Sequence, residues 1–147
     1  MSAASNYLEH KLVDHIFRGQ TFTKPTSLWV GLCTAAPDDS SIGTEVSGNN
    51  YARVEVACSL STWLATQGST SPAVASSGTG GLTSNAAAVT FPTPSGDWGT
   101  VTHWIICDTD GSPAGNLLFW GALSASKTIQ SGDDVAFVAG ALQITVG

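Results

Sequence analysis

Over most of its 147 residues the chain alternates between short apolar segments and turns rich in Gly, Pro, Ser, Asn and Asp, and this alternation constrains the fold most strongly. The apolar segments are rich in Val, Ile, Thr and aromatic residues, which favour β-strands. A helical period occurs once, near the N-terminus, so the helical crossovers that a parallel sheet needs are missing. We therefore predict a mainly β protein, an antiparallel, jelly-roll-like β-sandwich over residues 21–147. The expected strands are 27–33, 51–57, 86–91, 101–107, 117–123 and a pair within 135–146.

The N-terminal residues 1–20 are predicted to form an arm that contains one amphipathic helix over 6–17. Ser5 is a suitable N-cap for this helix, and Gly19 supplies a natural stop. Apolar residues at helical spacing share one face, which must be covered either by the sandwich of the same chain or by a neighbouring subunit. They are therefore candidate interface residues. The stripe consists of Leu8, Leu12 and Ile16, and Val13 and Phe17 widen it.

Composition points to further contact surfaces. Only 11% of the residues are charged, against roughly 25% in an average soluble domain, so part of the surface is expected to be covered by partners. Two of the five tryptophans, Trp63 and Trp98, lie in predicted loops. Each is either a lid over the core or an anchor in an interface, and both are candidate interface residues. The tryptophans within predicted strands are expected in the core: Trp29, Trp104 and Trp120.

A segment rich in Ser, Gly and Thr at residues 66–85 is nearly free of charged and bulky side chains. This composition predicts a long loop within the sandwich domain. In an assembly such a segment could lie along a neighbouring subunit as an extended arm.

The charge and cysteine patterns exclude several classes of protein. The net charge is −6 and the five Lys and Arg residues are scattered, so binding to nucleic acid is not expected. No apolar stretch is long enough for a membrane span. The first 15 residues lack the apolar core of a signal peptide, so we expect synthesis in a reducing cytosol. The widely spaced cysteines are expected to be reduced and buried: Cys33, Cys58 and Cys107.

Residue types that could carry chemistry do not assemble into a site. His10 and His15 would point about 140° apart on a helix, so they cannot share a metal ion. The segment 108–116 resembles a calcium loop, but its glycine is misplaced, and Asp-Gly between apolar strands predicts a hairpin turn. We therefore expect no catalytic, cofactor-binding or metal-binding residues. The adjacent acidic residues lie in contexts typical of turns: Asp38–Asp39 and Asp133–Asp134.

Five segments occur in an order that is more specific than any of them alone: YLEHKLVDHIF, LWVGLCTAAPDD, GTEVSGNNYARVEV, VTFPTPSGDWGTVTHWIICD and GNLLFWGALSASKTIQSGDDVAFVAGALQITV. In these segments, which cover most of the chain, it resembles a family of small tailed-phage and prophage proteins. Members are often labelled tail-fibre proteins or virion structural proteins. The resemblance implies a structural role in the particle without enzymatic activity. The chain departs from the family mainly in a longer insert around residues 66–82.

A compact acidic chain without repeats or a coiled coil favours a capsid decoration, or cement, protein over a component of the tail. A tail or tail-fibre component is the first alternative, and a host-surface adhesin that binds carbohydrate is the second. The expected partners are the major capsid protein or other virion proteins, together with further copies of the chain itself. The expected location is the exterior of the virion, after synthesis in the host cytoplasm.

Overall fold

The computed structural model describes residues 2–67, 74–112 and 115–146. These residues form one helix and ten strands, which confirms the prediction of a mainly β chain with an N-terminal helix. The elements in chain order are β1 (Ser2–Ala4), α1 (Asn6–Phe17), β2 (Ser27–Ala35), β3 (Thr44–Glu45), β4 (Val54–Ala57), β5 (Leu82–Ser84), β6 (Val89–Thr90), β7 (Gly99–Cys107), β8 (Leu117–Ile129), β9 (Ala136–Phe137) and β10 (Gln143–Thr145).

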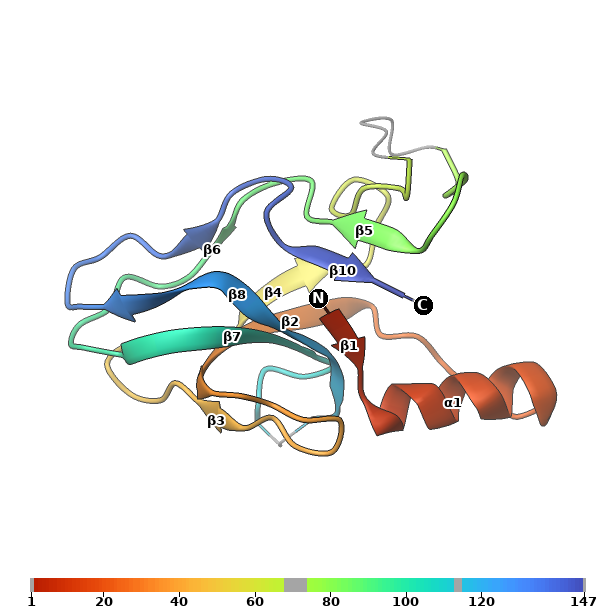
Figure 1. Ribbon diagram of the computed structural model, residues 1–147, viewed down its shortest axis with the longest axis horizontal. Coiled ribbons are helices and arrows are strands. Elements are labelled where there is room, and N and C mark those ends of the chain that lie inside the picture. Colours follow the sequence, from red (N-terminus) through yellow and green to blue (C-terminus); the bar gives the residue numbers. More distant parts are fainter. Residues whose placement is uncertain (1, 68–73, 113–114, 147) are drawn as a thin grey trace.

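The main sheet is antiparallel throughout, as predicted, and has the order β1-β8-β7-β2-β3, with β4 also paired to β2. Its three long strands, β2, β7 and β8, lie side by side at the centre (Figure 1). Leu32 of β2 pairs with Trp104 of β7, which in turn pairs with Gly121 of β8. The alternation of side chains along these strands sends one set of apolar residues to each face of the sheet.

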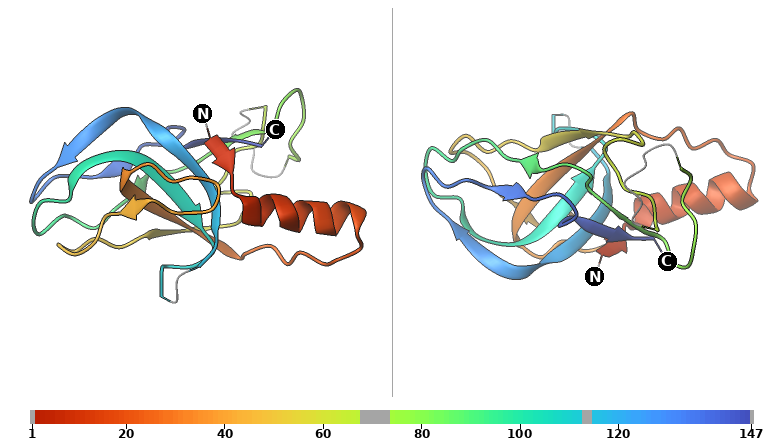
Figure 2. Two further views of the ribbon diagram at one scale, coloured as in Figure 1. Left: turned by 60° about the horizontal axis from the view of Figure 1, so that its bottom comes forward. Right: turned by 90° about the horizontal axis from the view of Figure 1, so that it is seen from above.

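A second layer covers one face of the main sheet. It consists of two short antiparallel pairs, β5 with β10 and β6 with β9 (Figures 1 and 2). The core between the layers is a single cluster in which Leu32 and Trp104 of the main sheet pack with Phe91, Leu142 and other residues of the second layer. Burying each such side chain contributes roughly 1.5–3 kcal/mol, so this cluster explains why the two layers stay together.

The opposite face of the main sheet carries a smaller buried cluster, formed by Cys33, Ile105, Cys107 and Leu117. The loop between β2 and β3 covers part of it. Within this loop, the Ile42 carbonyl accepts a hydrogen bond from Cys33 Sγ at 3.3 Å. The loop thereby covers part of the sheet face that lies opposite the second layer.

Several strand bounds differ from the predicted ones. β4 begins at Val54 rather than at residue 51, because Tyr51 leaves the strand direction and places its hydroxyl against β2. β8 continues to Ile129 instead of ending at residue 123, because β7 continues to pair with it. The predicted loop at 66–85 contains β5, which pairs with β10. Residues 68–73 of that loop lie outside the described residues.

Candidate functional site

The helix α1 is fixed to the β body at its N-terminal end. Ser5 is the N-cap, as predicted, and its hydroxyl accepts a hydrogen bond from the Leu8 amide at 3.3 Å. The Ser5 amide donates to the carbonyl of Leu118 in β8, and the Asn6 amide donates to the carbonyl of Asp39, both at 2.9 Å. Leu8 is buried beside them. The first turn of the helix therefore belongs to the packed body of the molecule.

The last turn of α1 projects away from that body, as the views of Figures 1 and 2 agree. Leu12 is half-buried, whereas Val13, Ile16 and Phe17 are 49%, 65% and 79% exposed. The predicted apolar stripe is therefore covered by the chain itself at its start and left open at its end. We call the open part, Val13, Asp14, Ile16, Phe17 and Arg18, the helix tip.

Hydrogen bonds fix the shape of the helix tip. The amides of Arg18 and Gln20 both donate to the carbonyl of Asp14, at 3.1 and 3.0 Å. The amide of Phe22, on the segment that returns to β2, donates to His15 Nδ1 at 3.2 Å. Side chains also meet, since Arg18 Nε lies 2.8 Å from Asp14 Oδ1 in an exposed ion pair. The tip thus presents an apolar surface beside a pair of charges.

A groove lies between β8 and β9 at the other end of the molecule. It encloses about 430 Å³ between residues 123–129 and 133–137, over a floor that includes Leu32, Phe91 and Val101. We call it the β8–β9 groove. A bulge in β8 shapes it, because β8 has four residues between Ala122 and Lys127 where β7 has one. Such a bulge bends its strand away from the neighbour and opens the sheet locally.

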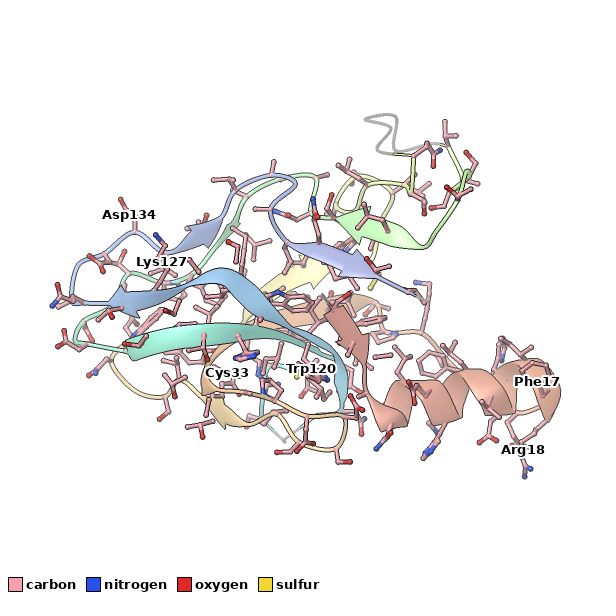
Figure 3. All side chains as sticks on the ribbon, viewed as in Figure 1. Phe17, Arg18, Cys33, Trp120, Lys127 and Asp134 are labelled. Carbon is pink, nitrogen blue, oxygen red and sulfur yellow. The ribbon has the colours of Figure 1, made fainter. Side chains whose placement is uncertain are left out.

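The rim of the β8–β9 groove is charged. Lys127, Asp133 and Asp134 line it and are exposed. In Figure 3 the labelled Lys127 and Asp134 lie near each other at this end of the molecule. Within the described residues, neither of these two side chains forms an ion pair. Asp133 is engaged in a turn, where its Oδ2 accepts a hydrogen bond from the Gln130 amide at 2.8 Å.

The structure separates the two candidate tryptophans. Trp98 is 5% exposed and lies in the main core, where its Nε1 donates to the Asn49 carbonyl at 2.9 Å. It offers almost no surface to a partner, so it has the position of a lid rather than that of an anchor. Trp63 is half-buried and also packs against the core, and its bridge to Asn85 ties it to the second layer.

The tryptophans predicted for the core fall into two groups. Trp104 is buried between the layers, as expected. Trp29 and Trp120 are half-buried, because they project from the opposite face of the main sheet. Trp120 Nε1 donates to Asp39 Oδ1 at 3.2 Å, which holds the covering loop against this face.

The sequence did not reveal a buried polar network beside β2. It lies between the part of β2 that pairs with β3 and the part that pairs with β4. Arg53 is 8% exposed, and its Nε and Nη2 donate to the two carboxylate oxygens of Glu45 at 2.8 and 2.7 Å. Arg53 Nη1 donates to the carbonyl of Thr109 at 2.9 Å. The Tyr51 hydroxyl donates to Glu45 and accepts from the Leu32 amide, each at 2.8 Å. The network therefore satisfies a strand edge that lacks a partner strand.

Electrostatics in this region follow from burial and from the ion pair. The hydrogen bonds to Glu45 raise the pKa of Arg53 above its ordinary value. Burial, with the Glu45 charge next, raises the pKa of the Tyr51 hydroxyl. Burial likewise raises the pKa of the Cys33 thiol to about 12 and that of Cys107 to about 11. These thiols are protonated and unreactive near neutral pH.

Two of the acidic residues weighed for catalysis or cation binding, Asp38 and Asp108, form hydrogen bonds within turns. Asp38 Oδ1 accepts a hydrogen bond from the Ser40 amide at 2.7 Å, as expected for a turn residue. The segment 108–116 joins β7 and β8, which confirms the predicted hairpin, and Asp108 closes it by accepting from the Asn116 amide at 2.6 Å. Its residues 113–114 lie outside the described residues. Among the residues that the structure describes, no three His, Cys, Asp or Glu side chains gather into a potential metal site.

A family model described as "Podophage GP4 fiber I protein gp80" matches residues 3–145. No curated protein matches the chain. At 12 residues α1 falls short of a membrane span, and the described part of the chain holds no other helix that would suffice.

Proposed function

The chain belongs to the podophage GP4 fiber I protein gp80 family, and on that basis we propose that it is a non-enzymatic structural component of the tail fibre. The observation that carries this proposal is the extent of the family match, which spans the helix, both layers of the β body and the connecting loops. A match over residues 3–145 concerns the whole fold and is not a local motif.

The distribution of exposed apolar residues supports a role in assembly. The helix tip exposes two large apolar side chains, Ile16 and Phe17, by 65% and 79%. Contiguous exposed apolar side chains usually mark a contact site, and a particle component can bury them against a neighbour. The buried charged groups of Glu45 and Arg53, by contrast, are used up in hydrogen bonds within the fold.

A capsid decoration protein is the second candidate, and it rests on a different observation. The low charge of the chain and its uncharged segment at 66–85 suit a protein that clamps neighbouring capsomers through apolar and hydrogen-bonded contacts. The family description favours the fibre, because it names a fibre protein. We therefore propose the fibre role first and treat the cement role as the alternative to be tested.

The test compares wild-type particles with particles that lack the protein. A fibre component predicts that the depleted particles assemble and keep their DNA on heating as wild type does, but adsorb poorly to host cells. Supplying the wild-type chain from a plasmid during infection should restore adsorption. Normal adsorption combined with earlier release of DNA on heating would contradict the fibre assignment and support the cement role.

A further inference from the structure

The helix tip and the β8–β9 groove lie at opposite ends of the molecule's longest axis. In Figure 3 the labelled Phe17 and Arg18 stand at the end of α1, and the labelled Lys127 and Asp134 stand at the far end of the β body. A surface at one end cannot reach the groove at the other end within the same molecule. Whatever covers either surface therefore comes from a second molecule.

The helix tip is arranged as an apolar ridge with charges along one side. At about 100° per residue, Ile16, Val13 and Phe17 fall within an arc of roughly 100°, and Asp14 and Arg18 follow on the next part of the circumference. The covered residues Leu8 and Leu12 lie on the other side of this arc. A partner that binds the ridge must therefore offer an apolar cleft with charged groups along one rim.

The β8–β9 groove has this composition. Its floor is apolar, formed in part by Leu32, Phe91 and Val101, and its rim carries Lys127 and the two acidic residues Asp133 and Asp134. The signs are reciprocal, because Arg18 of the tip can meet the acidic residues while Asp14 can meet Lys127. Complementary charges of this kind fix the register and orientation of a contact whose affinity comes from buried apolar groups.

We propose that the helix tip of one copy docks in the β8–β9 groove of a second copy, with Phe17 and Ile16 in the groove and Arg18 toward Asp133 and Asp134. This contact joins two different surfaces, so it propagates head to tail and produces a closed ring or an open chain. The inference concerns the purified chain and is independent of whether the particle carries it on the tail or on the head.

The test uses the full-length chain in sedimentation experiments over a range of protein concentrations. The wild type should self-associate as concentration rises. Phe17→Asp places a charge on the apolar ridge, and Ala125→Arg fills the groove from an exposed position. Each variant alone should associate at least about tenfold more weakly, as expected when an anchor residue worth more than 1.4 kcal/mol is lost.

Mixing the two variants gives the sharpest result. Each variant retains one intact surface, so a head-to-tail contact predicts that the mixture forms pairs with one copy of each and nothing larger. Leu60→Asp and Ala75→Arg change exposed residues elsewhere on the described surface, so they should associate like wild type. Circular dichroism should show that all four variants keep the wild-type fold.

Three outcomes would overturn the proposal. The first is a wild-type chain that stays monomeric at every concentration. The second is a variant mixture in which no pairs form. The third is a loss of association with Phe17→Asp but not with Ala125→Arg, since the helix tip would then bind something other than the groove.

Discussion

At the scale of single residues, the fold depends on a pair of opposite charges that are largely buried. Glu45 and Arg53 form a two-point ion pair whose side chains are 17% and 5% exposed. Removing a charge from water costs several kcal/mol, and the pair stabilises the fold only while both partners and their additional hydrogen bonds are present. The carbonyl of Thr109 and the hydroxyl of Tyr51 supply those additional bonds.

Replacing Glu45 by Ala should therefore destabilise the protein by about 3–5 kcal/mol, because it leaves the guanidinium of Arg53 buried without its partner. Chemical denaturation measures the free energy of unfolding directly. The paired variant Glu45→Leu with Arg53→Met removes both charges and should lose less stability than Glu45→Ala alone. An effect of Glu45→Ala below 1 kcal/mol would show that water reaches the guanidinium.

The cysteines should differ in reactivity according to their burial. Burial raises the pKa of all three thiols, but only Cys33 and Cys107 are buried as expected, whereas Cys58 is half-buried. A thiol reagent at pH 8 should therefore modify Cys58 first and reach the other two cysteines only as fast as the protein unfolds. Rapid modification of all three in the native protein would contradict their placement.

The same pKa values predict a dependence of stability on pH. An unfolded thiol loses its proton near pH 8.5, whereas Cys33 and Cys107 hold theirs until about pH 12 and 11. Their contribution to stability is thus complete below pH 8.5 and falls as the pH rises toward those values. The free energy of unfolding should fall between pH 8 and pH 10, and it should fall less in a Cys33→Ala, Cys107→Ala double variant than in wild type. The exposed Ser131→Ala serves as the control, because it removes no titrating group.

At the scale of elements, α1 shows which features the sequence can predict. Its bounds and its cap at Ser5 follow from signals within a few residues of each other, so they could be predicted. The long strands β2, β7 and β8 were predictable in existence and position from their apolar runs, but their full lengths were not, since β8 continues to Ile129. β1, β3 and β5 span two or three residues each, and their pairing depends on which strand the fold brings beside them.

The candidate site was predictable in part for the same reason. Helical spacing identified Leu8, Leu12 and Ile16 as one stripe, but only the placement of α1 decides that Leu8 is covered and Ile16 is not. The position of Trp98 in the core likewise depends on contacts with distant segments. The β8–β9 groove could not be predicted from the sequence. It forms between the bulge in β8 and the segment around β9, and neither feature is visible in a local pattern.

Ser5 joins α1 to the β body, so replacing it should destabilise both the helix cap and the contact with β8. Its hydroxyl caps the helix by accepting from Leu8, and it also donates to the carbonyl of Leu117 in β8. Ser5→Ala removes the cap, which costs about 0.5–2 kcal/mol, and leaves a buried carbonyl without its donor. We expect a loss of free energy of unfolding at or above the upper end of that range. The exposed Ser131→Ala should change stability by less than about 0.5 kcal/mol.

At the scale of the whole molecule, the protein consists of a self-contained β body and an extension that it does not cover. The two layers enclose one core, and both ends of the described chain lie close together, since Ser2 bonds to Thr145. The helix tip and the β8–β9 groove lie outside this closed arrangement, at opposite ends. A self-contained body with an uncovered apolar tip supports the proposal that the chain is a subunit of a larger assembly.

The number of copies in each particle tests the fibre assignment most directly. Quantitative mass spectrometry of purified virions gives the ratio of this chain to the major capsid protein. A fibre component predicts a ratio far below one, because fibres are attached at the tail, while capsid proteins cover the head. A ratio near one would contradict the fibre assignment and place the chain on the head as a decoration protein.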